Sequence, residues 1–221
     1  MQNLIKQEQF EIEILNKLNS KGLLRSLIFG GETMLRLCWG LNRFSVDLDF
    51  WVVKRINSDR LFNAVKNCLA EDYFIKDATN KFYTLLFEIK TKVYPRSLKI
   101  EIRKEPKKIN IEQAIAYSKY SNLQVMVKTV SLKDMMYAKI KAFLEREEIR
   151  DAFDIEFLFK KGIPLDCSEE DLKNLLKTIR SLTKRDYAVK LGALLEEKER
   201  NYYITNGFKI LELAIKEKLF R

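Results

Sequence analysis

The chain has 221 residues, of which 47% are hydrophobic and 33% are charged, and these proportions exclude a globally disordered protein. It contains no histidine, which excludes catalytic triads, histidine general bases and histidine-ligated zinc. Any bound metal would be held mainly by carboxylates, which favour hard cations such as Mg²⁺ or Mn²⁺. The net charge of +10 makes a polyanion a reasonable partner, and a solvated lysine-rich surface is the alternative.

The sequence carries no sign of a membrane or secretory protein. No apolar run approaches the roughly 18 residues that a membrane helix needs. The first 15 residues are charged throughout and lack the apolar core of a signal peptide. Cys38, Cys68 and Cys167 are widely spaced and form no CxxC motif, so we expect free cysteines rather than disulfides. We therefore expect a cytoplasmic protein with no membrane partner.

Helical and strand patterns alternate along the first part of the chain. Apolar residues recur at helical spacing over residues 4–20 and again after Ser58, a predicted N-cap. Strands are predicted over residues 23–29 and 46–53, and a short helix over residues 32–39 separates them. This part of the chain is therefore predicted to mix strands and helices.

The rest of the chain changes from strands to helices. Strands are predicted over residues 81–89, 97–104 and 123–130, and the segment between the last two is predicted to be irregular. From Ser131 onward the pattern is helical, with one break at Gly162. We therefore predict an α+β chain of two domains. A mixed sheet flanked by helices would occupy residues 1–130, and an all-helical domain would occupy residues 131–221.

Two aspartates interrupt the apolar strand over residues 46–53. Side chains alternate across a strand, so Asp47 and Asp49 point to one face and the apolar residues point to the other. Their Cα atoms would lie about 6.5 Å apart, which lets both carboxylates converge on one cation or bridge two. A solvated edge strand is the alternative. Without a cation or a basic partner, two carboxylates packed against a sheet would be costly to keep ionised.

The segment just before these aspartates suits a phosphate. Gly30 and Gly31 end a strand and open a helix, so backbone N–H groups at the helix N-terminus are available to an anion. Arg43 and Ser45 add a cation and a hydroxyl donor. A phosphate-binding turn followed by a metal-binding carboxylate pair is the arrangement that nucleotidyl transfer requires.

These residues resemble a known family. The run "GGETMLRLCWGLNRFSVDLDF" is similar to the signature of the AbiEii-like nucleotidyltransferases, the toxin components of abortive-infection toxin–antitoxin pairs. In that signature, Gly-Gly-Thr and a short helix precede Arg-x-Ser-x-Asp-x-Asp-Phe. The chain departs from it at Glu32, which stands before Thr33 where threonine usually follows the second glycine.

A second stretch, residues 138–158, resembles the family's C-terminal motif of a lysine, an arginine and then Arg-Asp-x-x-Asp. The matching residues of this chain are Lys139, Arg146, Arg150, Asp151 and Asp154. Read from spacing alone, the same residues would form an ordinary salt-bridged helix. The order of the two motifs along the chain also agrees with the family.

The resemblance implies a polymerase-β-like nucleotidyltransferase fold with a third carboxylate on a neighbouring strand. Glu101 is the candidate, because it alternates with apolar residues in "LKIEI", although it could instead be a partner of Lys99. Asp47 and Asp49 would then hold the metals, and Glu101, as the third metal ligand, would help to activate the attacking hydroxyl, directly or through a metal. The glycine turn, Thr33, Arg43 and Ser45 would hold the triphosphate. Lys139 would neutralise its charge, Asp151 would orient Lys139, and Arg146, Arg150 and Asp154 would support them.

The function expected from these motifs is that of a type IV toxin that uses Mg²⁺ or Mn²⁺ to transfer a nucleotide from an NTP to an RNA acceptor such as tRNA. The neighbouring gene would then encode an antitoxin. The alternatives are a small-molecule nucleotidyltransferase of the antibiotic-modifying type, and a module that binds NTP or RNA without catalysis. The basic run "RKEPKK" at residues 103–108 would be either an RNA contact or solvated surface.

Overall fold

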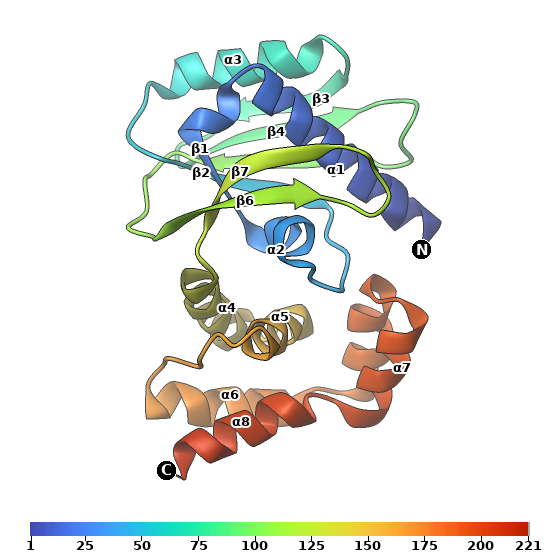
Figure 1. Cartoon of the computed structure of the whole chain (residues 1–221), viewed down its shortest axis with the longest axis vertical. Helices are drawn as coiled ribbons and strands as arrows, with labels where there is room; N and C mark the ends of the chain where they lie inside the picture. Colours follow the sequence, from blue (N-terminus) through green and yellow to red (C-terminus); the bar gives the residue numbers. More distant parts are fainter. Residues whose placement is uncertain (221) are drawn as a thin grey trace. The chain divides into compact units, whose positions relative to one another are not determined.

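The computed structural model of the protein describes residues 1–220. The chain divides into two compact units, residues 1–131 and residues 132–221, which we call the sheet unit and the helical unit (Figure 1). Within the described residues, no helix is long and apolar enough to cross a membrane. The predicted α+β class, with a mixed sheet flanked by helices and a helical C-terminal part, is confirmed.

The sheet unit is built on one seven-stranded sheet with the strand order β3-β4-β5-β2-β1-β7-β6. The strands are β1 (Leu27–Gly30), β2 (Asp47–Val52), β3 (Phe74–Asn80), β4 (Thr84–Lys90), β5 (Leu98–Arg103), β6 (Ile111–Tyr117) and β7 (Gln124–Val130). The central strand β2 is antiparallel to β1 and parallel to β5. The outer hairpins β3–β4 and β6–β7 are antiparallel.

The helices of this unit are α1 (Gln2–Ser20), α2 (Gly31–Trp39) and α3 (Ser58–Ala70), with a 3₁₀ turn, η1 (Leu23–Ser26), before β1. Helices α1 and α3 contact each other and cover the sheet, α3 over β3 and β4 and α1 over β5 and β7 (Figure 1). The buried side of β2 presents Leu48, Phe50 and Val52, each at most 1% exposed. The opposite side of the same strand carries Asp47 and Asp49, as the alternation predicts.

Three predictions for the sheet unit are wrong. The expected strand over residues 23–29 begins only at Leu27, because Gly22 turns the chain at a φ of 70° and a 3₁₀ turn follows. Strands β3 and β6 were not predicted. They are the two edges of the sheet and expose many of their side chains, so their apolar pattern is weak. The N-cap of α3 is Asn57, whose side chain accepts from the Arg60 N–H at 2.9 Å, and not Ser58.

The helical unit consists of α4 (Leu132–Arg146), α5 (Ile149–Lys160), α6 (Glu169–Ser181), η2 (Asp186–Leu191), η3 (Gly192–Leu194), α7 (Glu197–Asn206) and α8 (Lys209–Leu219). α4 packs on α5, and α6 packs on α8. The predicted break occurs after α5, where Gly162 adopts a φ of 87°. The Ser168 side chain caps α6 by accepting from the Asp171 N–H at 3.1 Å.

Candidate active site

Three carboxylates meet on the polar face of β2 and β5. The parallel register places Asp49 directly beside Glu101 and Asp47 beside Lys99. Neighbouring strands lie about 4.8 Å apart, and carboxylates two residues apart on one strand share a face. Asp47, Asp49 and Glu101, which the sequence predicted as metal ligands, therefore lie together in the sheet unit.

The carboxyl group of Asp49 lies in a strongly negative environment. Its pKa is raised to about 7, first by burial and then by the charges of Glu32, Glu101 and Asp47. Arg103 acts in the opposite direction and does not cancel the shift. The charges of Glu32, Glu101 and Asp47 disfavour the ionised form of Asp49. A bound cation would reduce the repulsion among these carboxylates.

Glu101 is paired with Lys99 and also faces the two aspartates of β2. Its Oε1 atom lies 2.5 Å from Lys99 Nζ, and this hydrogen bond is the main reason that the pKa of Lys99 is raised. The two residues belong to the same strand, so the ion pair runs along β5 rather than between strands. Glu101 still interacts with the other carboxylates, because its charge is one cause of the raised pKa of Asp49.

The glycine turn approaches Asp49 closely. Gly30 pairs with Asp49 across β1 and β2. Gly31 opens α2 at a φ of 72°, and a Cβ atom there would lie 2.6 Å from Asp49 Oδ2. A Cβ atom on Gly30 would lie 1.9 Å from the ring of Trp51. Both positions therefore require glycine, and the first N–H groups of α2 begin beside the carboxylates.

Two of the residues expected to hold phosphate are buried beside the turn. Thr33 is 1% exposed, and its hydroxyl donates to the Asp47 carbonyl at 2.5 Å, so it ties α2 to the start of β2. Arg43 is 2% exposed and lies 3.7 Å from Glu32 through Nη2. Ser45 is half-buried in the segment that enters β2.

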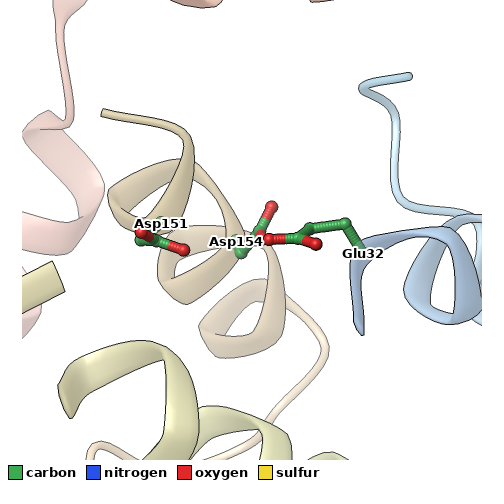
Figure 2. A group of neighbouring side chains, drawn as sticks. All are labelled: Glu32, Asp151 and Asp154. Carbon is green, nitrogen blue, oxygen red and sulfur yellow. The ribbon is translucent and has the colours of Figure 1, made fainter. Parts of the chain in front are cut away.

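Glu32 departs from the family signature, but in the structure its carboxylate acts on Asp49. It projects from the first turn of α2 (Figure 2), and its charge is the largest electrostatic contribution to the raised pKa of Asp49. The signal in the sequence is its position directly after Gly31. A side chain in the first helical turn after a strand lies close to the neighbouring strand's end.

The predicted residues of the second motif form an ion-pair cluster inside the helical unit. Lys139 Nζ on α4 lies 3.1 Å from Asp151 Oδ1 and 2.7 Å from Asp154 Oδ2. Both aspartates belong to α5 and are fully buried (Figure 2). Arg146 donates to the two oxygens of Asp151 at 2.7 and 2.8 Å. Arg150 is exposed.

The interpretation of this motif as a single salt-bridged helix is wrong. Helix α4 ends at Arg146, and Glu147 takes a left-handed φ of 54° before α5 begins. The ion pairs therefore join two helices instead of successive turns of one helix. Within the helical unit, Asp151 contacts two cations and Lys139 contacts two carboxylates.

Known proteins share the fold of this chain, and a family model matches its sequence. No curated protein sequence matches the chain. Among solved structures, a protein from H. pylori assigned as a candidate nucleotidyltransferase has 24% identity and a TM-score of 0.61, covering 94% of this chain and 96% of its own. JHP933 from Helicobacter pylori has 24% identity and a TM-score of 0.54, covering 95% and 94%. These likenesses confirm the fold.

The family model described as "Nucleotidyl transferase AbiEii toxin, Type IV TA system" matches residues 13–204. That range includes both motifs, and the glycine turn, the carboxylates of β2 and β5 and the lysine–aspartate cluster all fall inside it. The predicted resemblance is confirmed. The chain belongs to the AbiEii family of nucleotidyltransferase toxins of type IV toxin–antitoxin systems.

Proposed function

We propose that the protein transfers a nucleotide from an NTP to an RNA acceptor such as tRNA, with Mg²⁺ or Mn²⁺ held by Asp47, Asp49 and Glu101. The observation that carries the proposal is the register of β2 and β5, which sets Asp49 beside Glu101. The raised pKa of Asp49 supports it, because burial and three neighbouring carboxylates all act against the ionisation of this side chain.

The donor set fits a hard divalent cation. Carboxylate oxygens are the ligands that Mg²⁺ and Mn²⁺ prefer, and three carboxyl groups lie on one face of the sheet. A bound cation would supply charge neutralisation at the transferred phosphate. The residues of the chain would orient the triphosphate and the attacking hydroxyl around the carboxylates, and such positioning is most of what phosphoryl chemistry requires.

The glycine turn is suited to the triphosphate. Helix α2 begins at Gly31, and Gly30 at its N-cap has no side chain to occupy the first N–H groups. Phosphate oxygens could therefore accept from these backbone groups and also gain from the helix dipole. The Ser45 hydroxyl would add a donor. Arg43, which is buried against Glu32, would act by positioning this turn.

The reaction follows from these placements. A hydroxyl oxygen of the RNA would attack the α-phosphorus of the NTP, and a new oxygen–phosphorus bond would form. The bond from the α-phosphorus to the bridging oxygen would break, and pyrophosphate would leave with that electron pair. The hydroxyl proton would pass to Glu101, which lies beside Asp49 on the neighbouring strand.

The helical unit is proposed to act through Lys139, with the unit contributing to the active site. Family position supports a role for its ammonium group in neutralising the triphosphate or the leaving pyrophosphate. Asp151 and Asp154 hold that group at 3.1 and 2.7 Å, so the proposed role of Asp151 is to orient Lys139. Arg146 and Arg150 would support this arrangement.

The test is incubation of the protein with each labelled NTP, Mg²⁺ and total tRNA. We expect one or more labels to enter RNA with the wild type and none with Asp49→Asn. Glu88→Gln is the matched control, because Glu88 lies on the same sheet face but is paired with Lys76 and Ser97. Label that enters only a small molecule would contradict the RNA acceptor, and equal labelling by Asp49→Asn would contradict the assigned site.

A further inference from the structure

Two large aromatic side chains lie exposed at the tip of the β3–β4 hairpin. Phe82 is 83% exposed and Tyr83 is 64% exposed, and their rings meet edge to face with centroids 4.6 Å apart. Hairpin tips are usually polar or glycine-rich. Adjacent aromatic rings that the chain itself leaves uncovered are typical of a binding surface.

The hairpin tip lies beside a basic segment. The Lys104 N–H donates to the Tyr83 carbonyl at 3.0 Å, and Thr84 pairs with Arg103 across β4 and β5. Lys81, Arg103, Lys107 and Lys108 are all exposed, whereas Glu105 is the acidic residue of residues 103–108. The exposed rings therefore adjoin a surface of strongly positive charge.

The same surface extends to Trp51. Arg103 pairs with Trp51 across β5 and β2, and its guanidinium carbon lies 5.8 Å from the ring centroid. Lys107 Nζ lies 5.2 Å from that centroid. Two cations thus share one aromatic ring. Burial lowers the pKa of Lys107, and the charge of Arg103 adds to that shift. An anion between them would relieve this repulsion.

The surface also adjoins the carboxylates. Trp51 and Arg103 each follow a carboxylate by two residues on its own strand, so they lie on the same face of the sheet at a distance of about 7 Å along it. The charge of Arg103 also reaches Asp49, where it partly offsets the rise in pKa that burial and the neighbouring carboxylates cause. In Figure 1 the chain leaves β2 toward α3 and leaves β5 toward β6 on the same side of the sheet.

We infer that the hairpin surface, made of Lys81, Phe82, Tyr83, Arg103, Lys107 and Trp51, binds a single-stranded segment of the RNA acceptor and leads its reactive end to Asp49. The inference rests on the proposed transfer to RNA. Unpaired bases stack on exposed aromatic rings, and arginine and lysine beside those rings bind the phosphates. A duplex keeps its bases stacked on each other and could use only the cations.

The inference is tested by the affinity of a fluorescent single-stranded RNA for the full chain. All proteins carry Asp49→Asn, so that binding is measured without transfer. We expect Phe82→Ser with Tyr83→Ser to weaken binding about tenfold for each ring. Arg103→Gln should weaken binding and lower the slope of log affinity against log salt by about one.

The controls are on the same hairpin but at its other end. Phe74 is 71% exposed and pairs with the exposed Lys90. Phe74→Ser and Lys90→Gln therefore remove a matched ring and a matched cation, and we expect both variants to bind RNA as the parent protein does. A duplex RNA of the same length should bind more weakly than the single strand and should not respond to loss of the two rings.

The result that overturns the inference is unchanged RNA affinity in the Phe82 and Tyr83 variants. The same result is expected if the surface binds a protein partner instead. An equal loss in Phe74→Ser would also overturn it. These outcomes are distinct from failure of the proposed function, because transfer of label to RNA by the wild type would then continue and only the binding surface would be wrongly assigned.

Discussion

The sheet unit and the helical unit each gather ionised side chains, but they balance the charge differently. In the helical unit, Asp151 contacts both Lys139 and Arg146, and Asp154 contacts Lys139. In the sheet unit, burial and then the charges of neighbouring carboxylates raise the pKa of Asp49 to about 7. The aspartates of the helical unit therefore contact cations, whereas Asp49 is repelled by the carboxylates around it.

This difference distinguishes ion pairs that stabilise the fold from carboxylates that would bind a cation. Removing one member of a balanced buried cluster leaves an uncompensated ion and destabilises the fold. Removing one member of a repulsive group relieves strain in the free protein and weakens only the binding of a cation. The two regions should therefore respond to substitution with opposite signs in stability.

The largest effect is expected from Asp49→Asn on nucleotide transfer. The amide keeps the shape of the side chain but loses the negative charge that would hold the cation. We expect the rate to fall by about 10³-fold or more, which corresponds to about 4 kcal/mol of transition-state stabilisation. Single-turnover labelling measures it, and Glu88→Gln should retain most of the wild-type rate. A loss of less than tenfold would contradict the central place of Asp49.

Lys139→Met should have the largest effect on stability. It leaves Asp151 and Asp154 without the cation that joins them, and breaking a buried ion pair costs about 3–5 kcal/mol. Denaturant unfolding followed by circular dichroism measures the change. Lys133→Met is the control, since the ion pair of Lys133 with Asp166 is exposed, and such pairs contribute less than about 1 kcal/mol. Equal losses in both variants would refute the structural role.

Comparing Gly31→Ala with Gly40→Ala distinguishes the effect of backbone strain from the effect of a Cβ atom that contacts Asp49. Gly31 and Gly40 both have a φ between 70° and 80°, but a Cβ atom has nothing within 4 Å at Gly40 and meets Asp49 Oδ2 at Gly31. We expect both alanine variants to lose about 1 kcal/mol from the strained φ. Only Gly31→Ala should also lose transfer activity, by about tenfold or more. Equal activity of the two variants would mean that the turn does not shape the site.

The last effect is the pH dependence of the metal-free protein. Asp49 has an ordinary pKa near 3.8 and a folded value of about 7, so the folded state holds this proton more tightly than the unfolded state. Its contribution to stability is complete below about pH 4 and is lost as the pH rises through 7. At pH 8 in a chelator, Asp49→Asn should melt a few degrees above the wild type. If Asp49→Asn melted below the wild type, that result would contradict repulsion between Asp49 and its neighbouring carboxylates.

The common facing of Asp47 and Asp49 could be predicted from the sequence, because alternation along a strand is a local property. The choice of Glu101 needed the family resemblance, which implies a third carboxylate, and alternation then placed it on the polar face of its strand. The pairing of Asp49 with Glu101 depends on a register between strands about fifty residues apart, and no local pattern contains it.

The missed features are also understandable in physical terms. Strands β3 and β6 lie at the sheet edges, where few side chains are buried, so they lack the apolar pattern of a central strand. The contacts of Lys139 depend on a left-handed residue at Glu147, where glutamate is not expected. The effect of Glu32 on the pKa of Asp49 depends on the close approach of the glycine turn to β2, which no local pattern contains.

The most direct test of the central claim is the melting temperature in Mn²⁺ compared with a chelator at pH 8. A cation that binds only the folded protein at 100 times its dissociation constant adds about 2.7 kcal/mol. We predict a rise of several degrees for the wild type and for Glu88→Gln, and no rise for Asp49→Asn. An equal rise in Asp49→Asn, or none in the wild type, would contradict the assignment of Asp47, Asp49 and Glu101 as the cation site.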